Sequence, residues 1–266
     1  MSEEKIDRAE SMRKGIYILP NLFTTGSLFA GFYGLVASMS GEFKTAAIWI
    51  LVSSVFDGLD GKVARATGTT SKFGVEYDSL ADLVAFGVAP GLLMYSWALK
   101  PFGRLGWLAA FLFVVCGALR LARFNVQVNT VESKRFVGLP IPAAASMVSS
   151  TVLLFSHFGW PSSYKKLAIL ILIYCLAFLM VSNIKYYSFK DPEMIKRQPF
   201  GFLVLAVLLL IVIAAEPAMM TFVLFICYVM SGPIGYLVTW PRRRRLERAV
   251  RKGHEALVQP GTKKQP

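Results

Sequence analysis

DGLDGKVARATGTTSKFGVEYDSLAD, residues 57–82, places four aspartates where the flanking sequence is strongly apolar. These residues are Asp57, Asp60, Asp78 and Asp82. An ionised carboxylate is expensive inside a membrane, so acidic residues within a span usually serve a function. This stretch therefore decides where the chemistry of the protein should be sought.

The composition around it is that of a membrane protein, because 55% of the 266 residues are hydrophobic and 13% are aromatic. A membrane-spanning helix needs about 20 mainly apolar residues. Backbone polar groups in lipid must also be paired within each span, which favours helices. We predict an all-α, polytopic bundle of about eight transmembrane helices, with one membrane domain at 1–241 and a basic tail at 242–266. The predicted spans are 20–38, 43–66, 72–99, 104–126, 139–158, 165–185, 199–215 and 217–239.

The net charge is +13, and the basic residues lie mostly on one side of the predicted membrane spans. This distribution argues against nucleic acid as a partner. Most of the 29 Lys and Arg residues lie at the two termini and in the even-numbered loops. The positive-inside rule then places both termini on the cytoplasmic side of the cytoplasmic membrane. The basic tail has two open interpretations, an orientation signal or an attractor for anionic lipid headgroups.

The four aspartates are expected to meet at one depth. Asp57 and Asp60 are three residues apart and Asp78 and Asp82 are four apart, so each pair shares a helix face. At about 1.5 Å per residue, all four lie roughly 21 to 31 Å from the outer ends of their helices, near the cytoplasmic surface. Carboxylates without His or Cys suit Mg²⁺ or Mn²⁺, and two ions could be bridged. Interfacial pairing with Lys or Arg is the alternative, but four acids at one depth argue against it.

The residues between the aspartates suit a phosphate-bearing ligand. Small residues at Gly61, Ala64 and Gly74 allow helices and a ligand to approach closely. Arg65 and Lys72 supply cations at the membrane surface. We interpret these five as residues that surround a phosphate-binding pocket at the level of the lipid headgroups.

The stretch resembles the signature of the CDP-alcohol phosphotransferase family, D-x-x-D-G-x-x-A-R-x8-G-x3-D-x3-D, at every fixed position. The resemblance implies a homodimeric membrane enzyme that displaces CMP from a CDP-linked substrate with an alcohol. In such an enzyme Asp57, Asp60 and Asp78 hold metal ions, and Asp82 contacts the second ion or acts as the general base. The residues that would then contact the CDP-linked lipid are Gly61, Ala64, Arg65, Lys72 and Gly74.

Further segments are similar to members of the family that use serine as the alcohol. These segments are LPNLFTTGSLFAG (19–31), DSLADLVAFGVAPG (78–91), GALRLARFNV (117–126) and FVGLPIPAAA (136–145). CDP-diacylglycerol and L-serine are then the implied substrates. The last three predicted spans match only in being apolar.

Serine carries a carboxylate, so its site should offer a cation. The candidates lie at and after the inner end of the fourth predicted span: Arg120, Arg123, Asn125, Lys134 and Arg135. The alternative is that these residues only set orientation or extend toward the interface.

Two other functions fit parts of the pattern. Glycerol 3-phosphate or inositol phosphate could be the acceptor in the same family, because the basic cluster would also bind a phosphate. A divalent cation transporter would also place carboxylates in membrane helices, but such sites tend to lie near the midplane, in repeated halves.

Overall fold

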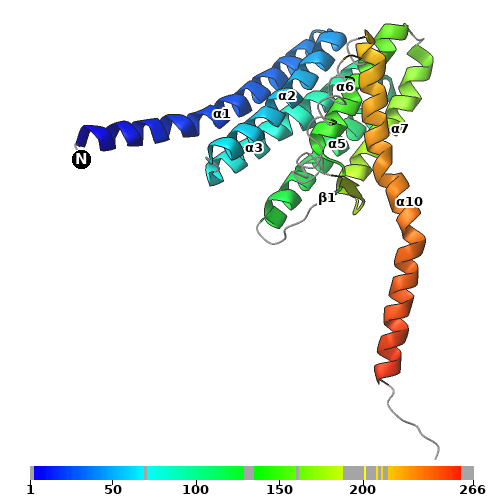
Figure 1. The fold of residues 1–266 in the computed structure, drawn as a ribbon. Helices are drawn as coiled ribbons and strands as arrows, with labels where there is room; N and C mark the ends of the chain where they lie inside the picture. The colour runs from blue at the N-terminus through cyan, green and yellow to red at the C-terminus, as the bar shows by residue number, and fades with distance from the viewer. Residues whose placement is uncertain are drawn as a thin grey trace, which may run out of the picture.

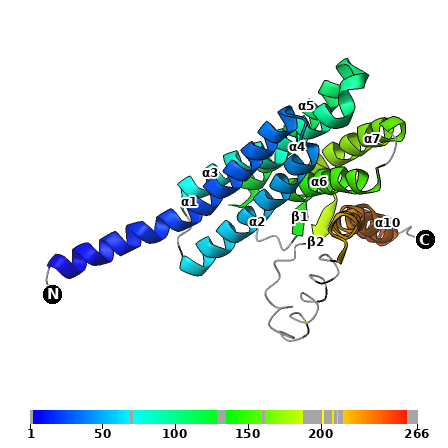
Figure 2. The ribbon, with the colours of Figure 1, turned by 90° about the horizontal axis from the view of Figure 1, so that it is seen from above.

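The protein is a bundle of membrane helices joined at one end by a two-stranded sheet, as the computed structural model in Figure 1 shows. The structure describes residues 3–68, 71–128, 135–159, 162–187 and 215–258, together with 201, 208 and 211. Figure 1 shows that the first and last helices both extend well beyond the body of the bundle, and Figure 2 shows the same for the first helix. The predicted all-α architecture is confirmed apart from the short strands.

The first two helices, α1 (Glu3–Met39) and α2 (Phe43–Thr67), form a closely packed hairpin. Gly41 makes the turn between them with φ of +81°, a left-handed conformation that favours glycine. Hydroxyl groups join the two helices inside the bundle, where Ser27 Oγ and Ser53 Oγ lie 2.8 Å apart. Small polar residues of this kind allow close helix packing in lipid.

The next membrane helix, Lys72–Phe102, is irregular along its length. It comprises α3 (Lys72–Asp82), a π-helical turn at Leu83–Val88, α4 (Ala89–Met94), a second π-helical turn at Tyr95–Leu99 and a 3₁₀ turn at Lys100–Phe102. In the first π turn the Ala89 N–H donates to the Val84 carbonyl, five residues back. Such turns are frequent near functional sites, and this one directly follows Asp82.

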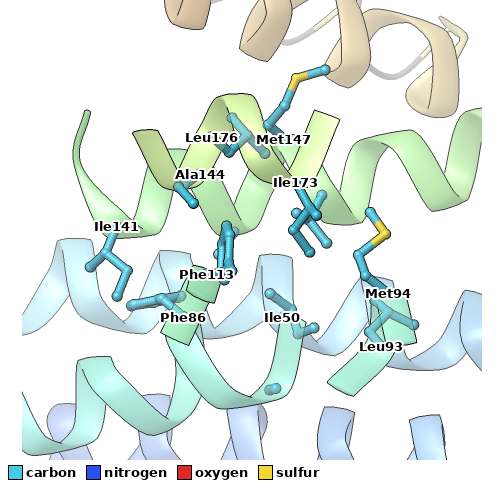
Figure 3. Close-up of a cluster of buried hydrophobic side chains, with 14 of the residues drawn as sticks. Ile50, Phe86, Leu93, Met94, Phe113, Ile141, Ala144, Met147, Ile173 and Leu176 are labelled. Atoms are coloured by element: carbon cyan, nitrogen blue, oxygen red, sulfur yellow. The ribbon is translucent and has the colours of Figure 1, made fainter. Parts of the chain in front are cut away.

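Three further helices, α5 (Arg104–Val128), α6 (Ile141–Phe158) and α7 (Ser162–Val181), complete the body of the bundle. Their inward faces meet α2 and α4 in an apolar core whose central side chains are at most 1% exposed. Figure 3 labels Ile50, Phe86, Leu93, Met94, Phe113, Ile141, Ala144, Met147, Ile173 and Leu176. This core fixes the helices that carry the four aspartates.

Two short strands, which the sequence did not predict, join the loops before α6 and after α7. β1 (Arg135–Val137) pairs antiparallel with β2 (Lys185–Tyr187), with Phe136 opposite Tyr186. The predicted span 165–185 is therefore wrong at its end, because α7 stops at Val181. The strand pairing gives the following backbone its hydrogen-bond partners where the helix no longer can.

The last helix, α10 (Pro217–Val258), runs from the membrane into the predicted basic tail without a break. The boundary predicted at 241/242 lies inside this helix, so a separate tail stays a prediction. α1 also begins earlier than predicted, since it passes through Pro20 and starts at Glu3.

Within the described part of the chain, five helical segments are long and apolar enough to cross a membrane, which makes this an integral membrane protein. α2 is not among them, because Lys44, Asp57, Asp60 and Lys62 leave it no sufficiently uncharged window. The shorter apolar segment Lys166–Val181 belongs to α7. The span predicted at 199–215 falls almost wholly outside the described residues, so the total of eight stays a prediction. The five segments are Leu19–Met39, Lys72–Phe102, Arg104–Val126, Ile141–Phe158 and Pro217–Val238.

Candidate active site

Three of the predicted aspartates form a compact cluster where α2 ends and α3 begins. One carboxylate oxygen from each of Asp57, Asp60 and Asp78 lies within 4.8 Å of the others. Gly68 ends α2 in a left-handed conformation, with φ of +64°, and the Ser71 hydroxyl caps α3 by accepting the Gly74 N–H at 3.0 Å. This local chemistry reverses the chain and returns α3 beside the acids of α2.

The cluster has the composition of a site for a hard divalent cation. Asp60 is only 5% exposed, while Asp57 and Asp78 are partly buried. Three carboxylates at this spacing repel one another unless a cation or protons offset their charge. Their oxygen-only ligand set fits Mg²⁺ or Mn²⁺.

One residue that holds this cluster was not foreseen from the sequence. The hydroxyl of Thr24, on α1, donates a 2.9 Å hydrogen bond to Asp60 Oδ2 and is itself 4% exposed. A hydrogen bond of this kind fixes the orientation of a ligating carboxylate. The available signal was a hydroxyl within the segment LPNLFTTGSLFAG, but its partner lies 36 residues away.

Asp82 lies beside the cluster and does not belong to the group of close oxygens. It occupies the last position of α3, one turn beyond Asp78, and is 8% exposed. Asp57, Asp78 and Arg120 all lie within its electrostatic reach. The structure thus places the fourth aspartate outside the group of close oxygens, with a burial similar to that of Asp60, and its role as a metal ligand stays a prediction.

The residues predicted to contact the CDP-lipid lie at the end of the cluster nearest the turn between α2 and α3. Arg65 and Lys72 are exposed on either side of the turn, at the end of α2 and the start of α3. Arg65 lies back across Gly61, where an added Cβ would be 3.4 Å from Arg65 Nη1. A Cβ at Gly74 would lie 3.5 Å from Asn21 Oδ1 of α1. Ala64 is partly buried between these positions.

Among the serine-site candidates, Arg120 is the one that the structure brings to the aspartates. Its side chain is 9% exposed, with Asp82 and Asp57 within electrostatic reach, and its guanidinium carbon lies 5.7 Å from the centroid of the Phe124 ring. Burying a cation in a membrane protein is costly unless an anion faces it. Asp82 and Asp57 supply such anions, and binding of a serine carboxylate by Arg120 stays a prediction.

The other candidates have structural partners or lie outside the described part of the chain. Arg123 Nη2 donates to Asn183 Oδ1 at 2.8 Å, and Asn125 Nδ2 donates to Ser79 Oγ at 3.0 Å. Lys134 falls outside the described residues. Arg135 begins β1, and its side chain is likewise outside the description.

A family model described as CDP-alcohol phosphatidyltransferase matches residues 17–189. This chain belongs to that family. The matched part of this CDP-alcohol phosphatidyltransferase contains all four aspartates and Arg120, and it ends before α10 begins.

Curated relatives of this CDP-alcohol phosphatidyltransferase are named for serine. The chain is 47% identical over 178 residues to the CDP-diacylglycerol–serine O-phosphatidyltransferase of Helicobacter pylori, which covers 67% of this chain and 75% of the relative. It is 31% identical over 268 residues to the protein of that name from Mycobacterium tuberculosis, covering 91% of each. It is 39% identical over 170 residues to the archaetidylserine synthase of Methanothermobacter thermautotrophicus, covering 63% of this chain and 69% of the relative. The two names differ in the lipid and share serine.

Proposed function

We propose that this protein transfers the phosphatidyl group of CDP-diacylglycerol to L-serine and releases CMP. The observation that carries the proposal is the position of buried Arg120 and Asp82 beside the aspartate cluster. An acceptor that has both a hydroxyl and a carboxylate would find one partner for each group. Asp82 would face the hydroxyl and Arg120 the carboxylate. The names of the relatives identify such an acceptor as serine.

Asp57, Asp60 and Asp78 would hold one or two divalent cations, Mg²⁺ or Mn²⁺. Bound there, the ions would neutralise the pyrophosphate of the CDP-lipid and the charge that develops on the leaving CMP. Thr24 keeps the Asp60 carboxylate in one orientation through its 2.9 Å hydrogen bond. The protein's own contribution to this part of the site is a fixed arrangement of oxygens.

The nucleotide end of the donor would lie over the turn between α2 and α3. Gly61, Ala64 and Gly74 have small side chains or none, so the nucleotide can approach the helix backbone closely. Arg65 and Lys72 supply cations for phosphate oxygens. The acyl chains would remain in the lipid beside the bundle. Phosphoryl transfer depends mostly on positioning and charge stabilisation, which a rigid two-helix site supplies.

Asp82 would accept the proton of the serine hydroxyl. The serine oxygen then forms a bond to the phosphorus that bears diacylglycerol, and the bond from that phosphorus to the CMP oxygen breaks. Arg120 would pair with the serine carboxylate and hold the hydroxyl near Asp82. An in-line attack of this kind should invert the configuration at phosphorus.

We further propose that the site and both termini face the cytoplasm and that the enzyme is a homodimer. The distribution of basic residues supports the orientation. Family membership supports the dimer. Neither proposal is needed for the chemistry of a single site.

The decisive experiment measures CMP release by purified protein given CDP-diacylglycerol, Mg²⁺ or Mn²⁺ and one acceptor at a time. We expect release with L-serine and its loss when the divalent ions are chelated. Release only with glycerol 3-phosphate or inositol phosphate would contradict the serine assignment. Metal flux across vesicles without CMP release would indicate a transporter.

A further inference from the structure

A pair of polar side chains links the helix of the aspartates to the helix that carries Arg120. Asn125 of α5 donates from Nδ2 to the Ser79 hydroxyl of α3 at 3.0 Å, and Asn125 Oδ1 lies 3.3 Å from the same oxygen. Both side chains are partly buried. The Ser79 hydroxyl donates in turn to the Val75 carbonyl oxygen at 3.0 Å. Its own helix therefore holds this hydroxyl in an orientation that leaves a lone pair for Asn125.

A close contact farther along the same helices fixes their register. A Cβ added at Gly91 of α4 would lie 3.2 Å from Val114 Cγ2 and 3.4 Å from the Ala110 carbonyl oxygen of α5. The segment from Ser79 to Gly91 thus runs antiparallel to the segment from Asn125 to Val114. The α5 helix is held against the helix of the aspartates at both ends of this stretch.

Asp82 and Arg120 lie between these two contacts. Asp82 is about 4.5 Å along α3 from Ser79, and Arg120 is about 7.5 Å along α5 from Asn125, in the same direction. The two residues therefore differ in height by only about 3 Å. Their side chains are buried, and each lies within electrostatic reach of the other. The hydrogen bond between Asn125 and Ser79 consequently sets the register of the carboxylate against the guanidinium.

We propose that Asn125 and Ser79 are positioning residues, whose hydrogen bond holds Asp82 and Arg120 at the separation that the acceptor alcohol must bridge. The inference rests on the proposed function and deepens it, because it assigns Asn125 to the framework of the site and not to the serine ligands. Serine is a short acceptor, so its hydroxyl and carboxylate cannot follow two helices that move apart. A displacement of about 1 Å can lower a rate by about 100-fold.

The test compares Ser79→Ala, Asn125→Ala and the double variant with the wild-type protein, all full-length and purified. Each single variant should lower kcat/KM for L-serine by about 10- to 100-fold, because either change removes the same bond. The double variant should fall no further, since the effects of two residues that share one interaction are not additive. The KM for CDP-diacylglycerol should stay unchanged, because the aspartate cluster and the turn between α2 and α3 keep their arrangement.

Ser79→Thr and the size of each loss separate positioning from direct binding of the acceptor. Threonine keeps the hydroxyl, so this variant should retain most of the wild-type kcat/KM for L-serine. If Asn125 bound serine directly, Asn125→Ala would cause a large loss, Ser79→Ala a small one, and the two losses would add. That pattern would overturn the inference while leaving the proposed function intact.

Tyr77→Phe is the matched control, because it removes another hydroxyl of α3 that contacts a neighbouring helix. The Tyr77 hydroxyl lies 2.9 Å from the Thr25 hydroxyl of α1. We expect kcat/KM for L-serine to stay unchanged in this variant, since α1 does not carry Arg120. A loss equal to that of Ser79→Ala would show a general effect of helix packing and would overturn the inference.

Thermal midpoints of the wild-type protein, Ser79→Ala, Asn125→Ala and the double variant test the bond independently of activity. We expect decreases that do not add, and strictly additive decreases would show that no bond joins the two residues. An equal loss of CDP-diacylglycerol binding and serine turnover would show a structural role alone, which would also overturn the inference. Failure of the wild-type protein to release CMP with serine would instead reject the proposed function, and the midpoints would still test the bond.

Discussion

Thr24 and Thr25 are neighbours on α1, but their hydroxyls meet different partners. Thr24 donates to Asp60 in the aspartate cluster. The Thr25 hydroxyl lies 2.8 Å from the Asn21 carbonyl oxygen and 2.9 Å from the Tyr77 hydroxyl, on the exposed side of the helix. One residue step therefore separates a contact with a proposed metal ligand from a contact outside the cluster.

Thr24→Val should weaken metal binding, because Asp60 loses the donor that orients it. We expect the Mn²⁺ concentration that gives half-maximal CMP release to rise about 10- to 100-fold. Thr25→Val, its control, should leave that concentration unchanged. An equal effect of the two substitutions would show that Thr24 acts through helix packing instead.

Asp82 differs from the other three aspartates in its surroundings, and we predict a different role for it. Asp82→Asn removes the proton acceptor and keeps the size of the side chain. CMP release should fall by about 100-fold or more, while binding of CDP-diacylglycerol in the presence of Mg²⁺ should change little. Asp78→Asn should weaken that binding. Retained turnover in Asp82→Asn would refute its assignment as the base.

At the scale of helices, close packing between α1 and the first π-helical turn holds the site in register. A Cβ added at Gly31 would lie 2.5 Å from both Cα and Cβ of Ala85. Backbone cannot yield as a flexible side chain does, so the helices would have to separate. Asp82 lies three residues before Ala85, and separation would therefore disturb the site.

Gly31→Ala should destabilise the protein by about 1–3 kcal/mol, the usual range for overpacking a tight interior. The measurement is the thermal midpoint in detergent. Gly235→Ala on α10 is the control, since an added Cβ there meets nothing within 4 Å. That substitution should be neutral or slightly stabilising, because alanine favours a helix more than glycine does. A stable Gly31→Ala variant would contradict the packing described here.

At the scale of the whole molecule, the charged residues of the site and the buried apolar core occupy different parts of the bundle. The aspartate cluster, Arg65 and Lys72 share the end where α2 stops and α3 starts. The buried apolar core lies farther along the same helices (Figure 3). The continuous helix α10 runs along the bundle and on into the basic C-terminal segment.

The proposed orientation predicts that a tag at the C-terminus lies on the cytoplasmic side. Protease added to intact spheroplasts should leave the tag in place, and protease added to inverted membrane vesicles should remove it. The physical reason is that basic flanking residues are retained on that side. Cleavage in intact spheroplasts would reverse the orientation and place the aspartate cluster on the outer surface.

The sequence alone determined the membrane class and the aspartates of the site. Asp57, Asp60 and Asp78 lie within 22 positions on two helices joined by one turn, so helix spacing alone predicted that they would meet. Family motifs carried the prediction further, to the acceptor. The sequence could not separate Asp82 from the other three, since spacing does not tell which acid lies outside the group of close oxygens.

Only the tertiary structure decided which distant residues join the aspartates. Thr24 and Arg120 are far from the aspartates in the chain, and their position at the site depends on how each helix is rotated about its own axis. An apolar span gives little sign of that rotation, because lipid and the protein interior favour the same side chains. Packing at positions such as Gly31 and Gly232 sets the rotation, and so it selects which polar groups face the site.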